Sequence, residues 1–248
     1  GDIETTNLTV DVAADTTIDD IEAGTGTVNV TQADADVALT FTTIAASTVD
    51  LSAVAGAVTI TQGAGAALMS AVGAAGATTM VFTGTTHENT FESTNAEDDS
   101  VTFVNTTGAA TAVYAGGDNT TLANALTTGT VAVTAGAGDD VLEVNAITSG
   151  HATAALGDGD NTVRVGDGGA MAANGTVTVT TGTGDNTLVI EDNGVASFTI
   201  TMDFGTGTGT LDISEGTIDI TDGTFDLTGM DVIAIGSSTT AAVVDATL

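Results

Sequence analysis

The sequence contains no cysteine, proline or tryptophan, and its only basic residue besides two histidines is Arg164. The lack of cysteine excludes disulfide bonds. The formal net charge of −32 argues against nucleic-acid binding, which needs Lys and Arg to displace counterions from phosphates, and equally against binding to anionic membrane surfaces. No run of 18 apolar residues occurs, so we expect no transmembrane helix and no membrane insertion.

Histidine is almost as scarce, since the chain has only His87 and His151. A catalytic nucleophile such as serine needs a neighbouring base, most often histidine, and neither histidine stands in a recognisable motif. Carboxylates are plentiful but lie in repeated turns, whereas catalysis needs one unique arrangement. We therefore expect a protein that is not an enzyme.

What the chain has in excess is acid, with 33 Asp and Glu residues, together with 42% hydrophobic residues. High net charge favours disorder only when hydrophobicity is low, so we expect a folded chain. A compact fold of this charge repels itself, and a bound cation would relieve the repulsion. Calcium prefers carboxylate and carbonyl oxygens, so Ca²⁺ is the expected cofactor.

Short alternating runs of β-branched and small polar residues dominate the sequence, as in 28–30, 131–133 and 177–179. This alternation is typical of half-buried strands, and the Gly, Asn and Asp residues between the runs favour turns. The best helical candidate is 66–76, which is rich in alanine but weakened by its glycines. The pattern predicts an all-β fold.

A repeat stands out in the second half, where Gly-Asp turns begin at Gly117, Gly138, Gly159 and Gly184, at offsets of 21, 21 and 25 residues. Apolar alternation follows the last three turns. This period predicts a parallel β-solenoid (a β-roll or β-helix) with coils of about 21–25 residues. The lack of proline fits, because every coil must donate backbone hydrogen bonds to the next. The alternative is a pair of tandem β-sandwich domains.

The repeat suggests three regions. Residues 1–98 are β-rich and form either further coils or a separate β domain. Residues 99–215 form the solenoid, with a possible earlier turn at 97–100. Residues 216–248 form a cap, an assembly strand or a secretion signal.

The segment 135–143 (AGAGDDVLE) resembles the nonapeptide G-G-x-G-x-D-x-U-x of the RTX, or hemolysin-type, calcium-binding repeats. The resemblance covers roughly residues 115–215. It implies calcium between successive coils, with Asp140 as a ligand and Leu142 as a core plug. At the other turns the sixth position is Asn, and the carboxylate has moved to the fifth. Across all four turns the expected metal ligands are Asp118, Asn119, Asp139, Asp140, Asp160, Asn161, Asp185 and Asn186. The plain alternative is that Gly-Asp-Asn is favourable turn chemistry.

Repetition, small residues and an acidic surface together resemble bacterial S-layer proteins. The resemblance implies a structural subunit of a self-assembling, calcium-stabilised extracellular surface layer or filament, with itself and cell-surface polysaccharide as partners. The alternative is a fragment of a large RTX-type adhesin, serving as a spacer or as a ligand-binding or ice-binding module. Thr162 and Thr187 align in the repeat, whereas Ala137, Asp158 and Thr183 break a second column, which argues against a regular ice-binding face.

Overall fold

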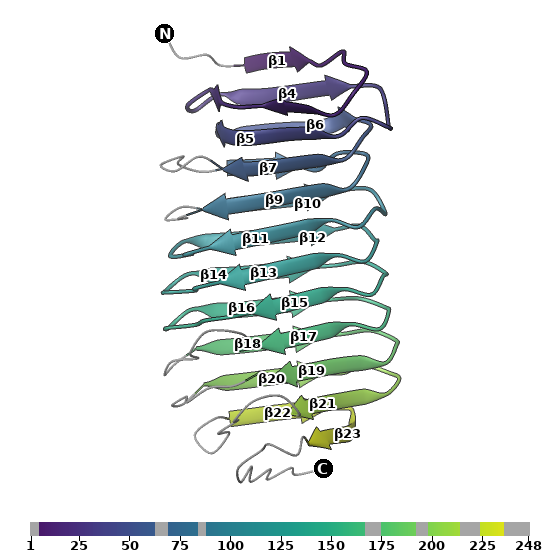
Figure 1. Ribbon diagram of the computed structural model, residues 1–248. Coiled ribbons are helices and arrows are strands. Elements are labelled where there is room, and N and C mark those ends of the chain that lie inside the picture. The colour runs from purple at the N-terminus through teal and green to yellow at the C-terminus, as the bar shows by residue number, and fades with distance from the viewer. Residues whose placement is uncertain are drawn as a thin grey trace.

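The computed structural model describes residues 5–62, 69–83, 88–166, 175–191, 198–213 and 224–235. These residues form a parallel β-solenoid, an upright stack of coils with two sheets (Figure 1). Sheet A contains, in spatial order, β1 (Thr5–Thr9), β4 (Thr27–Gln32), β6 (Thr48–Val54), β8 (Met69–Val72), β10 (Asn89–Ser93), β12 (Ala109–Tyr114), β14 (Thr130–Thr134), β16 (His151–Ala155), β18 (Thr176–Thr180), β20 (Thr199–Asp203) and β22 (Thr224–Thr228).

Sheet B lies opposite and takes the alternate strands of the chain. Its order is β2 (Thr16–Ile18), β5 (Leu39–Ala45), β7 (Val58–Gln62), β9 (Thr78–Thr83), β11 (Ser100–Val104), β13 (Thr120–Asn124), β15 (Val141–Val144), β17 (Thr162–Val165), β19 (Asn186–Ile190), β21 (Gly209–Ile213) and β23 (Met230–Ile235), and β3 (Ile21–Glu22) also pairs with β5. All of the described strand pairs are parallel, so one coil is a strand of sheet A, a corner, a strand of sheet B and a second corner. The predicted solenoid is confirmed.

The strands form because apolar residues alternate with small polar ones. In β14, for example, Val131 and Val133 are buried while Thr130 and Thr134 are exposed. Each coil sends these inward side chains into one continuous core between the two sheets. Aromatic rings also pack in this core, with Phe82 of β9 stacked on Phe103 of β11 at a centroid distance of 5.1 Å and Phe198 edge-on to Phe225 near the other end at 5.4 Å. Each sheet therefore has one face in the core, lined mainly by Val, Ala and other apolar residues, and one face in water, where Thr is frequent.

The same two sheets run from β1 to β23 across residue 98, so the described residues on both sides of it belong to one solenoid. The segment 66–76 is not helical where the structure describes it, because Met69–Val72 is strand β8. Early coils are less regular, with register shifts between Asn29 and Thr31 and between Phe41 and Ile44. No helix among the described residues is long and apolar enough to cross a membrane.

Candidate functional site: the acidic corner

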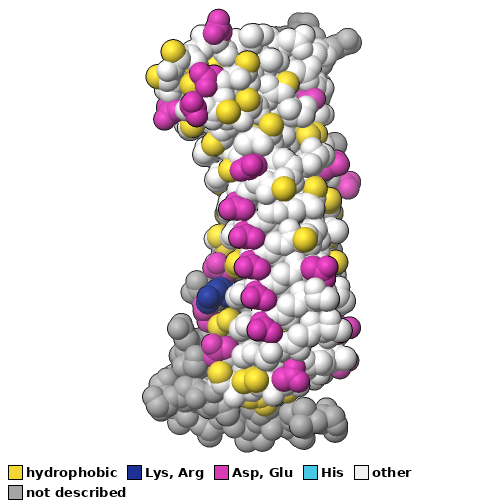
Figure 2. All heavy atoms as spheres, turned by 90° about the vertical axis from the view of Figure 1, so that its right-hand side faces the viewer, with side chains coloured by type: hydrophobic (Ala, Val, Ile, Leu, Met, Phe, Trp, Pro, Cys, Tyr) yellow, Lys and Arg dark blue, Asp and Glu magenta, His cyan; other side chains and the backbone are white. Residues whose placement is uncertain are grey.

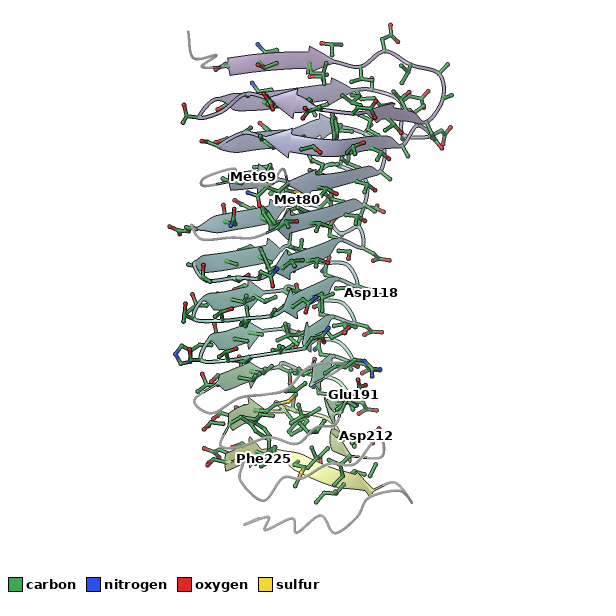
Figure 3. The ribbon with its side chains drawn as sticks, turned by 60° about the vertical axis from the view of Figure 1, so that its left-hand side comes forward. Met69, Met80, Asp118, Glu191, Asp212 and Phe225 are labelled. Atoms are coloured by element: carbon green, nitrogen blue, oxygen red, sulfur yellow. The ribbon has the colours of Figure 1, made fainter. Side chains whose placement is uncertain are left out.

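The Gly-Asp turns all fall at the same corner, where the chain leaves sheet A and enters sheet B. One of them, residues 135–140, joins β14 to β15, and another, residues 156–161, joins β16 to β17. Single bridges connect the corners of successive coils, from Gly116 to Ala137 and from Ala137 to Asp158. The corners therefore stack into one edge of the rod (Figure 1), and Figure 3 labels Asp118 at that edge.

Glycine is required at this edge because the coils approach so closely. Gly159 has φ +127°, and a Cβ built on it would lie 2.0 Å from the carbonyl oxygen of Gly138 in the preceding coil. Gly138 and Gly184 are in the same situation, with distances of 2.0 and 2.1 Å to the carbonyls of Gly117 and Gly159. Any side chain would push the stacked backbones apart.

The aspartate after each corner glycine forms an exposed ladder, which we call the outer row. The backbone N–H of Asp139 donates to Oδ1 of Asp118 at 2.8 Å, and that of Asp160 donates to Oδ1 of Asp139 at 2.8 Å. The row continues in both directions, since Asp118 N–H donates to Asp98 and Asp185 N–H donates to Asp160. Figure 2, which faces this edge, shows a column of acidic side chains along it, with further acidic side chains to either side.

The next residue in each corner belongs to a second, buried ladder, which we call the inner ladder and which consists of Asp99, Asn119, Asp140, Asn161 and Asn186. Its side chains act in the opposite direction, with Oδ1 of each accepting the N–H of the preceding coil. Asn161 N–H donates to Oδ1 of Asn186 at 3.0 Å, and Asp140 N–H donates to Oδ1 of Asn161 at 3.0 Å. The two ladders together bind each corner to the coils on both sides of it.

The asparagine amides have a further role within their own corner. Nδ2 of Asn119 donates to the carbonyl of Gly117 at 2.8 Å, Nδ2 of Asn161 to that of Gly159 at 3.0 Å, and Nδ2 of Asn186 to that of Gly184 at 3.1 Å. In every case the acceptor is two residues before the donor. The amide therefore satisfies a turn carbonyl that faces the interior.

Two inner positions carry a carboxyl group where the others carry an amide. Oδ1 of Asp140 accepts from both N and Nδ2 of Asn119, at 3.0 and 2.9 Å, but its Oδ2 is buried without a hydrogen-bond partner. Oδ2 of Asp99 is likewise buried and unpartnered. Burial raises the pKa of both groups, and that of Asp140 reaches about 6.

The expected calcium ligands are thus divided between two environments. The structure brings Asp118, Asp139, Asp160 and Asp185 into the outer row and Asn119, Asp140, Asn161 and Asn186 into the inner ladder. Among the residues that the structure describes, no group of three or more His, Asp or Glu lies close enough together to hold a metal ion. The inner amide oxygens are already occupied by backbone N–H groups. The described corners therefore form no enclosed group of three acidic ligands, and the carboxylate oxygens they leave without a hydrogen bond are the buried Oδ2 atoms of Asp99 and Asp140 and the solvent-facing oxygens of the outer row.

Sequence reasoning missed two further members of the ladders, Asp98 and Asp99, although the turn at 97–100 had been noted as a possible copy. It aligned Thr162 with Thr187, which are register partners, but missed the hydroxyl column on the outer face of sheet B to which this pair belongs and a second column on the outer face of sheet A. The column on sheet A consists of Thr5, Thr27, Thr48, Ser70, Thr90, Thr111, Thr153, Thr178 and Thr201, interrupted by Ala132. The column on sheet B consists of Thr17, Thr40, Thr59, Thr79, Ser100, Thr120, Thr162, Thr187 and Thr210, interrupted by Val141.

Other candidate groups are engaged in local contacts. Arg164 forms an ion pair with Glu191 at 2.6 Å. Nδ1 of His151 lies 2.6 Å from Oγ1 of Thr176 on the neighbouring strand. Asp158, which breaks the repeat, accepts from both N and Oγ1 of Thr183, and these bonds lower its pKa. His87 lies outside the described residues.

No protein-family model matches the chain, and neither the curated proteins nor the solved structures contain a significant match.

Proposed function

We propose that this protein is a structural subunit of a self-assembling extracellular surface layer or filament. The observation that carries the proposal is the use of the repeated polar residues. At each Gly-Asp corner the Asp and the residue after it, Asn or Asp140, form hydrogen bonds from coil to coil, so the repeat serves to build and stiffen a rod. A rod of stacked coils with a solvated surface suits a load-bearing or spacing role, because each coil contacts only its neighbours.

The acidic surface supports an extracellular setting in which divalent cations are available. In the outer row, carboxylates repeat at the strand spacing of about 4.8 Å. Each has one oxygen bonded to the next coil, as Asp139 does with Asp160. Calcium ligates carboxylate oxygens, so we propose it as a shared counter-ion that lies along the row and joins rows of adjacent subunits. Cell-surface polysaccharide is the proposed anchoring partner.

Electron microscopy of the purified chain tests this function. We expect ordered sheets or filaments in millimolar calcium chloride that dissolve in EDTA and re-form when calcium is restored. The matched variant is the triple substitution D118N/D139N/D160N, which keeps the oxygen that accepts each N–H and removes three charges. In millimolar calcium this variant should form fewer sheets or filaments than the wild type, or form them to the same extent with and without calcium. A wild-type chain that stays monomeric with and without calcium would overturn the proposal.

A second candidate, a ligand-binding or ice-binding module of an adhesin, is favoured by the hydroxyl columns. On β18 the outward side chains are Thr176, Thr178 and Thr180, and Thr178 continues a column of hydroxyls along sheet A. A flat array of this kind suits a ligand with its own regular lattice. An ice-recrystallisation assay with wild type and T178Y tests it. Inhibition by the wild type that T178Y abolishes would support the module, and inactivity of the wild type would exclude ice.

A further inference from the structure

Charge is unevenly distributed around the coils in the middle of the rod. Between residues 100 and 157 the only Asp and Glu residues are Asp118, Asp139, Asp140 and Glu143. The first three lie at the Gly-Asp corner, and Glu143 lies on sheet B. In these coils, sheet A and the opposite corner, where the chain returns from sheet B to sheet A, therefore carry no acidic residue. This neutral surface belongs to a chain whose net charge is −32.

The outward side chains of β12, β14, β16 and β18 form this surface on sheet A, and we call them the neutral face. Each strand contributes three, and they align into three columns because the strands pair in register. Glu92 of β10 and Asp203 of β20 border the face at its two ends. The members of the neutral face are Ala109, Thr111, Val113, Thr130, Ala132, Thr134, His151, Thr153, Ala155, Thr176, Thr178 and Thr180.

Sheet B is charged over the same coils, because Glu143 of β15 and Arg164 of β17 are register partners on its outer face. The neutral face instead exposes an apolar side chain. Val113 is 36% exposed, and the other exposed large apolar side chains among the described residues, Val232 and Ile233, both lie on β23. Removing water from apolar surface is favourable, whereas removing it from charges is costly. Of the two sheets, sheet A is therefore the one that a partner can cover at lower cost.

The partner that this face suits is a second copy of the chain. Two rods of charge −32 repel each other wherever their carboxylates meet, and at the neutral face two copies can touch without bringing acids together. Shape agrees with charge. The three columns form parallel ridges along the stack, so the ridges of one copy can lie in the grooves of an identical face, as in two packed sheets about 10 Å apart.

We infer that the neutral face is a lateral contact between copies of this protein, in which two rods pack sheet A against sheet A. The inference rests on the proposed self-assembly and adds a second kind of contact to it. Calcium joins acidic edges, and dry packing joins neutral faces. A contact between two like faces closes into a pair, whereas two different contacts on different sides of a rod let the assembly grow further.

The size of the neutral face predicts that this contact is weak on its own. Strands spaced about 4.8 Å apart, with about 3.3 Å per residue along each strand, give the face an area of about 300 Å². A stable pair of proteins buries about 800 Å² on each partner. Purified rods in EDTA should therefore remain monomeric. The contact should form when calcium holds many copies together, since linked contacts reinforce one another.

The test adds two charges to either face of the same part of the rod. T153E/T178E places glutamates at register partners of β16 and β18 on the neutral face, and the control T162E/T187E places them at register partners of β17 and β19 on sheet B. All four side chains point outward, so both variants should fold, which circular dichroism checks. In millimolar calcium, sedimentation and electron microscopy should show that T153E/T178E assembles only at a protein concentration at least about tenfold above that of the wild type, and the control within about twofold of it.

The outcomes separate this inference from the proposed function. A wild type that does not assemble in calcium overturns both. If the wild type assembles and T153E/T178E assembles at the same concentration, the neutral-face contact alone is overturned. The same holds if the control is impaired as much as T153E/T178E.

A second measurement observes the contact directly. The chain has no cysteine, so T178C and T187C each introduce a single thiol, the first on the neutral face and the second on sheet B. A nitroxide spin label on T178C should become immobilised when calcium drives assembly and mobile again in EDTA, whereas the same label on T187C should stay mobile. A label on T178C that stays mobile in the assembled state would overturn the contact, even if the glutamate variant fails to assemble.

Discussion

The corners in the two halves of the rod achieve the same stacking by different means. In the second half, corners from 115 to 186 repeat one arrangement of glycine, outer Asp and inner Asn or Asp. In the first half, each corner is different. Between β6 and β7 it is the short segment 55–57, and a Cβ on Gly56 would lie 2.0 Å from the carbonyl of Val37, as close as at Gly159. Close backbone stacking is therefore the common requirement.

Amide side chains close the early corners, but singly. Nε2 of Gln32 donates to the carbonyl of Asp34 at 2.5 Å, and its Oε1 accepts from Gly56 N–H at 3.4 Å. Asn95, in the corner whose Asp98 and Asp99 begin the two ladders, bonds to the carbonyl of Ala74. Since the solenoid forms there without a repeated acid, the outer row and the buried acid of the second half are not needed for the fold itself. This difference supports a role for the outer row in surface chemistry.

The largest effect should come from filling the stacking gap in either half. We expect Gly159→Ala and Gly56→Ala each to cost more than about 3 kcal/mol of unfolding free energy, because the new Cβ would overlap a backbone carbonyl. The control is Gly24→Ala, at φ +58° with open space around it, which should cost only about 1–2 kcal/mol. Urea unfolding followed by circular dichroism measures all three. Tolerance of Gly56→Ala alone would show that the halves differ in their stacking as well.

An intermediate effect is expected from the amides that close the corners. Asn161→Ala removes the acceptor of Asp140 N–H and the donor to both Asn186 and Gly159, all inside the rod. The cost should be about 2–4 kcal/mol, since buried polar partners are left unsatisfied. Gln32→Ala, which breaks an isolated pair of bonds, should cost about 1–2 kcal/mol in the same unfolding assay. Equal costs would argue that the inner ladder is no more cooperative than single amides.

The sequence reveals the solenoid where corner chemistry repeats, and less clearly where it does not. The offsets between Gly117, Gly138 and Gly159 fix both the coil length and the turn. In residues 1–98 the corners use Gln32, Gly56 or Asn95, which share no pattern, so only strand alternation remains visible and a separate domain stayed an open alternative. The residues predicted as ligands lie at one edge, as their repeat indicates, but their division into an outer row and an inner ladder depends on which residue of each pair points inward.

The hydroxyl columns could not be read from the sequence for a related reason. The sequence offset between partners in one column varies. It is 21 residues from Thr90 to Thr111, 25 from Thr153 to Thr178 and 23 from Thr178 to Thr201. Loops of varying length at the corners shift the register from coil to coil. A column becomes visible only when the hydrogen-bonded partners of each strand are known.

The smallest effect should come from the outer row, because its charges are exposed to solvent. Asp160 lies between Asp139 and Asp185, each about 4.8 Å away along the sheet, whereas Asp36 in an early corner is outside the row. We expect Asp160→Asn to raise the melting temperature by about 1–3 °C at low ionic strength, and Asp36→Asn to raise it less.

Salt separates this electrostatic effect from a change in packing. In about 1 M sodium chloride the screening length falls to roughly 3 Å, shorter than the spacing of the row, and the advantage of Asp160→Asn should disappear. The asparagine keeps an oxygen for Asp185 N–H, so the ladder itself is preserved. An advantage that persists in high salt would mean that Asp160 is unfavourable for reasons other than repulsion by its neighbours. The carboxylates of the outer row would then not repel one another measurably. Calcium would have no repulsion to neutralise there, and its proposed role would lose its physical basis.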